Sequence, residues 1–170
     1  AHYLNDEGYT NEILNGDIHT ANQKLAGLES RNQAKTFIYA LLYGAGDAKL
    51  GSVAGRGRAA GKQLRQSFFD NLPSFKALTG RVQREAKSGF VKALDGRKLT
   101  VRSEHAALNT LLQGAGAIVM KQALIILDQK IKKHNWDAKF VANVHDEWQI
   151  ECHVDDAVDV GKAGVQAIRE

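Results

Sequence analysis

Residues 90–101 read FVKALDGRKLTV, and this stretch marks the point where the chain changes its secondary structure. Apolar and polar residues alternate on both sides of Asp95-Gly96, which is a strong short-range signal for a β-hairpin. The preceding residues are rich in Ala, Leu, Lys and Gln and contain the only proline, a composition that favours helices. The sequence therefore predicts an α+β fold, with a helical half in residues 1–88 and a mixed half in residues 89–170.

The first half is expected to be a series of short helices separated by glycines. The clearest helix start is Ser30, because Ser30 and Gln33 match the capping-box pattern in front of an apolar run. That helix is expected to end near Tyr43, where Gly44-Ala45-Gly46 follows. The first of these is expected to be a turn-rich segment at residues 9–14. The others span residues 17–27, 31–43, 47–53, 58–69 and 74–87.

The second half is expected to continue from the hairpin into a long helix, from about residue 103 to 133. Apolar residues recur there at helical spacing and are expected to form one buried side, which consists of Leu108, Leu111, Leu112, Ala115, Ile118, Val119 and Leu124. Two strands follow, KFVANV at 139–144 and EWQIECHV at 147–154, with His145-Asp146 at the bend between them. A last helix is expected over residues 155–170. This order predicts a small antiparallel sheet packed on a long helix.

The composition, with 44% hydrophobic and 25% charged residues, is typical of a soluble globular protein. A single cysteine excludes a disulfide framework and a cysteine-based zinc cluster, and it suits a reducing compartment. The first residues, AHYLNDEGY, do not resemble a signal peptide, and no apolar run approaches the roughly 20 residues of a membrane span. We therefore expect a cytoplasmic protein that is not secreted and has no membrane partner.

The charge is distributed unevenly along the chain. Residues 51–100 contain 11 of the 23 Lys and Arg residues but only three of the 19 acidic ones, so this segment carries +8 and the remainder carries −4. Such asymmetry favours a polyanion as the partner of the middle segment. A solvated basic face explains the charge about equally well.

One side of the helix expected at 31–43 carries two cations followed by two aromatic rings. The stripe has a residue at every fourth position and drifts by about 40° per step; it consists of Arg31, Lys35, Tyr39 and Tyr43. It suits a ligand with phosphates at one end and a base at the other, because cations neutralise phosphate oxygens and rings stack on a sugar or base. An amphipathic helix with half-buried tyrosines is the commoner explanation of such spacing.

The sequence Val144-His145-Asp146-Glu147 places two carboxylates at a tight bend between strands, where they could hold a hard divalent cation. An aspartate chosen for its turn-forming hydrogen bonds is the ordinary alternative. A two-metal site needs ligands from more than one segment, so this pair is insufficient alone.

A polar stripe recurs every four residues on the long helix and consists of His105, Asn109 and Gln113. Amide side chains can contact the minor groove of a duplex with little base preference. The solvent-facing side of an amphipathic helix is the simpler explanation for each of them. The same holds for His19, which follows Asp17 at the start of a short helix and would ordinarily be a surface histidine.

Considered together, five blocks resemble family A (DNA polymerase I-like) DNA polymerases, and they occur in the family's order. Arg31-x3-Lys35-x3-Tyr39-x3-Tyr43-Gly44 resembles the finger-helix motif, and VHDE at 144–147 resembles the palm carboxylate motif. DIHT at 17–20 matches the segment before the finger helix, LDGR at 94–97 the connecting hairpin, and Asn109-x3-Gln113 the duplex-contacting helix. The segments NGDIHT at 15–20, KTFIYALLYGAGD at 35–47 and HAALNTLLQ at 105–113 are similar in sequence to the polymerases of short-tailed lytic phages.

The resemblance implies a role for each matched residue. The triphosphate of the incoming nucleotide would be held by His19, Arg31 and Lys35. Tyr39 would pack against its sugar; in the family this position is Tyr or Phe, and the hydroxyl affects how nucleotides without a 3′-OH are treated. Tyr43 would stack at the templating position beside Gly44. The primer–template duplex would be followed by Arg102, His105, Asn109 and Gln113.

The resemblance also implies roles for the carboxylate motif at 144–147, and it implies which part of the family's fold this chain covers. His145 would approach the primer end, and Asp146, with Glu147 close by, would bind the catalytic Mg²⁺ ions of a two-metal site. The family's first metal-binding Asp precedes the helix that begins this sequence, so we expect a fingers-plus-palm fragment, with fingers in 1–88 and a partial palm in 89–170. Such a fragment is expected to be inactive alone. Its exposed sheet edge favours either self-association or a local rearrangement.

The function expected on these grounds is DNA-directed DNA polymerisation by the parent enzyme, with primer–template DNA and deoxynucleoside triphosphates as partners and a processivity factor as a further candidate. A non-enzymatic basic DNA-binding module built on residues 51–100 is the main alternative. A small hydrolase that uses Asp146 and Glu147 alone is a weaker one. Dependence of nucleotide binding on Lys35 separates the polymerase from the DNA-binding module.

Overall fold

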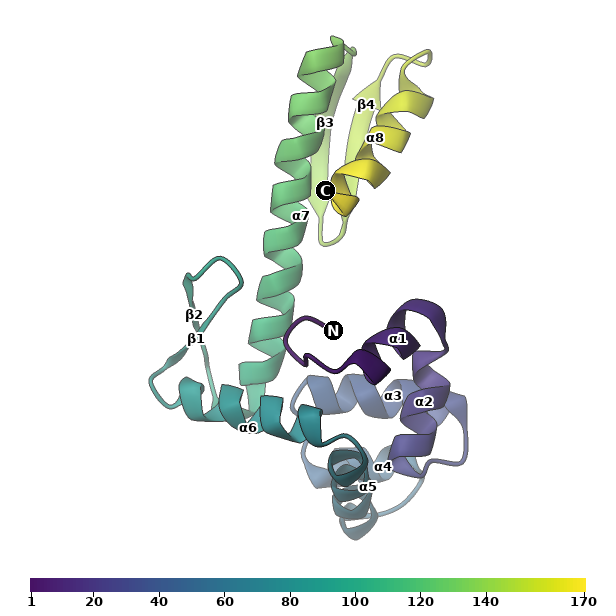
Figure 1. The fold of residues 1–170 in the computed structure, drawn as a ribbon, viewed down its shortest axis with the longest axis vertical. Helices are drawn as coiled ribbons and strands as arrows, with labels where there is room; N and C mark the ends of the chain where they lie inside the picture. Colours follow the sequence, from purple (N-terminus) through teal and green to yellow (C-terminus); the bar gives the residue numbers. More distant parts are fainter. The chain divides into compact units, whose positions relative to one another are not determined.

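Helices occupy most of the first half of the chain in the computed structural model, which describes all 170 residues (Figure 1). Every helix predicted for this half is present, and the α+β class is confirmed. The helices are α1 (Glu7–Asn15), α2 (Ile18–Ala26), α3 (Arg31–Leu42), α4 (Asp47–Val53), α5 (Arg58–Asn71) and α6 (Pro73–Ala86).

Side-chain caps explain where the first three helices begin. Asp6 and Asp17 each accept a hydrogen bond from a backbone N–H in the first turn of α1 and α2. Ser30 and Gln33 form the complete capping box predicted for α3. Because these side chains satisfy N–H groups that lack a partner within the helix, each start is fixed locally.

The second half contains two antiparallel hairpins and two helices. Strand β1 (Phe90–Lys92) pairs with β2 (Lys98–Thr100), and Gly96 provides the positive φ of 86° that the turn between them requires. A short 3₁₀ turn (Glu104–Ala106) leads into α7 (Ala107–His134). Strand β3 (Ala138–Val144) then pairs with β4 (Glu147–Cys152), and α8 (Ala157–Arg169) follows.

The chain divides into two compact units. The first comprises Ala1–Lys92 and Lys98–Leu111, and the second comprises Ala93–Arg97 and Leu112–Glu170. The sequence-based boundary at residue 88, between expected fingers and palm, is a functional division and stays a prediction.

The core of the first unit is aromatic. Phe37 of α3, Phe68 of α5 and Phe75 of α6 meet edge to face, with ring centroids 5.8 and 5.4 Å apart. Edge-to-face packing adds to the stabilisation from burial alone. This core fixes α3 by one side, which carries Ala34, Phe37, Ile38 and Leu41.

In the second unit, α7 and α8 cover one face of the β3–β4 hairpin (Figure 1). The buried helix residues are Ala123, Leu127, Ile131, Ala163 and Ala167. Phe140 and Ile150, which are paired across the strands, pack against them. The expected sheet packed on a long helix is therefore present, although Val119 of α7, expected on its buried side, is 44% exposed.

Residues 104–134 form one helix long and apolar enough to cross a membrane by length and composition, with a mean hydropathy of 1.5 over its best window. We expected no such segment, because no continuous apolar run in the sequence approaches 20 residues. A hydropathy averaged over a helical window tolerates the polar residues that interrupt such a run. Core helices of soluble proteins have the same length and composition, so this finding is weak evidence for a membrane span.

Candidate functional site

The stripe of cations and rings on α3 lies on the side opposite the aromatic core. Arg31 and Lys35 are exposed, and Tyr39 and Tyr43 are 49% and 59% exposed. The commoner explanation, in which the tyrosines are partly buried packing residues, accounts poorly for such exposure. The stripe is a surface of side chains free to contact a ligand.

Arg31 is paired with Asp17, which lies 14 residues earlier. The Nε of Arg31 donates to Oδ2 of Asp17 at 2.6 Å, and its Nη2 donates to Oδ1 at 3.2 Å. Together with the Thr20 hydroxyl, the guanidinium holds the pKa of Asp17 well below its ordinary value. This pair joins the beginnings of α2 and α3.

His19 lies beside the stripe. Its ring centroid is 6.2 Å from that of Tyr39, and its Nδ1 is buried without a hydrogen-bond partner. Lys35, one turn from Arg31, makes no ion pair or hydrogen bond. The structure therefore gathers His19, Arg31, Lys35 and Tyr39 around one surface, although His19 comes from a different helix.

Gly44 follows the stripe directly and is in close contact with the backbone of His105. Its φ is 78°, and a Cβ at this position would collide with the carbonyl of His105. Glycine is therefore required by both the backbone conformation and the available space. The contact brings the end of the stripe to the start of the polar stripe on the long helix.

A basic cleft of about 470 Å³ adjoins this contact. Gly44 and His105 line it together with Arg58, Lys62 and Arg65. Arg65 is paired with Asp47 at 2.9 Å, whereas Arg58 and Lys62 have no acidic partner. The excess positive charge found in residues 51–100 is thus placed, in part, beside two predicted site residues.

The remaining duplex-contact candidates lie around the start of α7. Arg102 and His105 are exposed before the helix, Asn109 is partly buried in its first turns, and Gln113 is exposed one turn later. Gln113 belongs to the second unit and the other three to the first.

Asp146 lies in the two-residue turn between β3 and β4, next to His145, whose φ of 56° is unusual for a residue other than glycine. Glu147 begins β4 and accepts a hydrogen bond from Gln149 at 3.1 Å. His145, Asp146 and Glu147 are all exposed. Two-residue hairpin turns require a positive φ at their first position, so the backbone of His145 follows from the turn itself.

The carboxylate pair fits only part of a metal site. Both side chains offer the hard oxygen ligands that Mg²⁺ prefers, but no group of three or more His, Cys, Asp or Glu side chains is close enough to hold a metal ion. The expected two-metal site therefore needs ligands in addition to Asp146 and Glu147.

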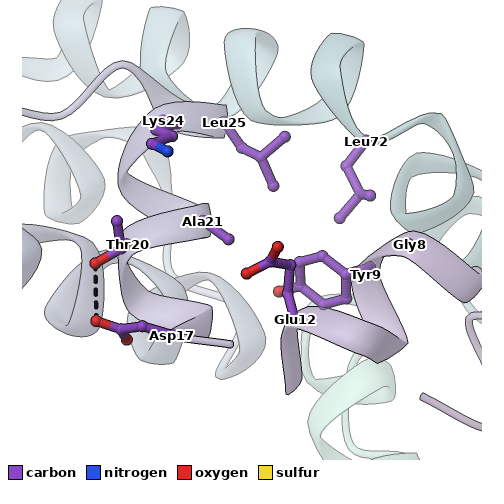
Figure 2. A pocket seen from close by; sticks show the side chains of 9 residues that line it. All are labelled: Gly8, Tyr9, Glu12, Asp17, Thr20, Ala21, Lys24, Leu25 and Leu72. Carbon is purple, nitrogen blue, oxygen red and sulfur yellow. Dashed lines mark hydrogen bonds between the residues drawn. The ribbon is translucent and has the colours of Figure 1, made fainter. Parts of the chain in front are cut away.

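A further cleft, of about 510 Å³, lies between α1 and α2 (Figure 2). Tyr9 and Glu12 of α1 face Leu25 of α2 and Leu72 across it, and the hydrogen-bonded Asp17 and Thr20 lie at its rim. Sequence reasoning treated Asp17 as a helix start and as part of the DIHT block, and gave it no site role. Its pairing with Arg31 could not be found from spacing, because helical spacing relates residues within one helix, whereas Asp17 caps α2 and Arg31 begins α3.

Comparison with known proteins agrees with this fold. The model of the DNA polymerase family A matches residues 1–169. The DNA-directed DNA polymerase of Enterobacteria phage T3 is 43% identical over the whole chain, and that of Escherichia phage T7 is 46% identical over 94% of it. The chain spans 27% and 26% of these two relatives.

A solved structure has the same fold. It is the POL domain of Pol1 from M. smegmatis in complex with DNA primer-template and dNTP, with a TM-score of 0.85 and 24% identity. The likeness covers 99% of this chain and 34% of that one.

The fold is thus that of a polymerase domain. The chain belongs to DNA polymerase family A. It matches about a quarter of the length of each of the two phage polymerases.

Proposed function

We propose that this chain is part of a DNA-directed DNA polymerase, which adds deoxynucleotides to a primer under the direction of a template. The observation that supports this best is the exposed stripe on α3 with His19 beside it, in a chain that matches the polymerase family over residues 1–169. The residue roles below are proposed on the same basis.

In this proposal, the incoming nucleotide lies along α3. Arg31, Lys35 and His19 contact its triphosphate, and the cations offset the negative charge that develops during transfer. Tyr39 packs against the sugar. Residues 1–88 would then act as fingers.

The template and duplex would be contacted beyond the end of the stripe. Tyr43 stacks at the templating position beside Gly44, and the duplex is followed by Arg102, His105, Asn109 and Gln113. The basic cleft beside Gly44 supports this assignment, because unpaired cations there can neutralise phosphates. The M. smegmatis structure, by its description, holds primer-template and dNTP, which are the partners we propose here.

Residues 89–170 would form part of the palm, with Asp146 and Glu147 as ligands of Mg²⁺ and His145 near the primer end. Two such ions, when bound, activate the primer hydroxyl and stabilise the leaving pyrophosphate. We also propose a cytoplasmic location, in the host if the gene belongs to a phage. Self-association and a processivity factor remain proposals that rest on the sequence alone.

The test of this function is Lys35→Ala in the complete polymerase that carries residues 1–170. We expect the KM for deoxynucleotides in primer extension to rise about tenfold to a hundredfold, because a charge-assisted contact to phosphate contributes about 1.5–3 kcal/mol. Steady-state extension over a range of nucleotide concentrations measures this.

Lys49→Ala is the matched control, because Lys49 is also exposed, lies on a helix of the same unit and makes no ion pair. It should leave the KM unchanged. If Lys35→Ala has no effect on nucleotide use while DNA binding remains salt-sensitive, the non-enzymatic DNA-binding module is the better description. Hydrolysis of a substrate that depends on Asp146 and needs no template would instead favour the hydrolase.

A second prediction concerns the hydroxyl of Tyr39, which is half-exposed beside His19. We expect the complete enzyme to accept dideoxynucleotides and Tyr39→Phe to discriminate against them by about tenfold to a hundredfold. The phenol can supply a hydrogen bond that the missing sugar hydroxyl would provide, and its loss leaves a polar group unsatisfied at about 1–3 kcal/mol. Competition between dideoxy- and deoxynucleotides measures the ratio.

Tyr43→Phe removes a hydroxyl one turn further along the same stripe and should leave that ratio as it is. Equal ratios for Tyr39→Phe and the parent enzyme would show that Tyr39 acts through packing alone.

A further inference from the structure

Asp17 accepts more hydrogen bonds than an ordinary helix cap. It receives the backbone N–H of His19 at 3.1 Å, the hydroxyl of Thr20 at 2.8 Å, and two donors from Arg31. Capping α2 requires only the first of these. The other contacts fix the carboxylate and, through it, the guanidinium of a residue on another helix.

The geometry of the pair leaves the useful side of the guanidinium free. The carboxylate engages Nε and Nη2, so it occupies one edge of the planar group. The second edge, formed by Nη1 and the remaining hydrogen of Nη2, makes no contact in the structure. A guanidinium has five N–H donors, and a free edge can bind a phosphate with two parallel hydrogen bonds.

Two effects of Asp17 on a triphosphate oppose each other. Its negative charge repels the phosphates, so removal of the carboxylate should tighten binding if charge alone mattered. Its two bonds to Arg31 hold a long, half-exposed side chain in one orientation, which otherwise would have to be immobilised when the nucleotide binds. The repulsion is weakened by solvent and by the adjacent guanidinium, since the pair is exposed and its charges cancel.

We propose that Asp17 is a positioning residue for the incoming nucleotide, which orients the free edge of Arg31 towards the triphosphate. This inference rests on the proposed function, in which Arg31 contacts the phosphates.

The test uses Asp17→Ser in the complete polymerase. Serine is a good helix cap, so the variant keeps the start of α2 and loses the pair with Arg31 together with the carboxylate that Thr20 contacts. We expect the KM for deoxynucleotides to rise about fivefold, the order expected for immobilising one long side chain, with kcat changed less than about twofold. The affinity for primer–template, measured without nucleotide, should stay the same.

A double-mutant cycle separates positioning from general destabilisation. In an Arg31→Ala background, Asp17→Ser should have no further effect on the KM, because the side chain that it positions is absent. Asp70→Ser is the matched control for charge: Asp70 is exposed in the same unit and contacts only Gln66 and Lys76. It should leave the KM unchanged.

An unchanged or lower KM for Asp17→Ser would overturn the proposal, and so would an equal rise of the KM in both backgrounds. These outcomes are distinct from failure of the proposed function. If Lys35→Ala and Arg31→Ala raise the KM but Asp17→Ser does not, the polymerase assignment stands and only the role of Asp17 is wrong.

Discussion

Asp146→Asn is expected to reduce template-dependent nucleotide addition by the complete polymerase at least about a thousandfold. Asparagine has the same shape and suits a turn, so the β3–β4 hairpin should be preserved. It lacks the negative charge that holds a divalent cation, and such an ion stabilises the transition state by several kcal/mol. Each loss of about 1.36 kcal/mol of this stabilisation slows the reaction tenfold. Single-turnover primer extension with magnesium measures the effect.

The matched control is Asp159→Asn, which removes the same charge from an exposed position on α8 in the same unit. Its rate should equal that of the parent enzyme. An Asp146→Asn enzyme that keeps a tenth or more of the rate would exclude Asp146 as a metal ligand.

The 170-residue chain by itself should give no extension in the same assay, because no third metal-ligating side chain joins Asp146 and Glu147. Template-dependent extension by the pure chain, abolished by Asp146→Asn, would contradict this and would require a metal site that the structure does not contain.

Gly61→Ala is expected to destabilise the first unit by about 3 kcal/mol, at the upper end for an added methyl group. Helices α4 and α5 approach so closely that a Cβ at Gly61 would collide with the backbone carbonyl of Asp47 and the backbone N of Gly51. Backbone atoms cannot move aside as a side chain can. For a chain of this length the melting temperature should fall by about 6–12 °C.

Gly80→Ala is the control, because Gly80 lies within α6 and the nearest atom to its added Cβ is the flexible end of Arg84, at 3.4 Å. Alanine favours a helix over glycine by about 0.8–1 kcal/mol, so this variant should be slightly more stable. Thermal unfolding followed by circular dichroism compares the two. Equal melting temperatures would mean that α4 and α5 separate easily.

The helix positions and both hairpins could be predicted because their causes are local. The capping box at Ser30 and the turn at Asp95-Gly96 act over a few residues, so the sequence shows each of them directly. The stripe on α3 was also visible, since helical spacing alone places its members on one side. The exposure of its tyrosines was left open, because the sequence alone did not exclude half-buried rings packed against a neighbouring element.

The local sequence by itself determined the order of the helices and strands, the caps, and the family to which the chain belongs. Tertiary structure decided which of the predicted residues meet: His19 beside Tyr39, Gly44 against His105, and Asp17 paired with Arg31. These contacts join residues 14 to 61 positions apart. No periodic pattern connects such residues, and they come together only because the aromatic core packs the helices around it.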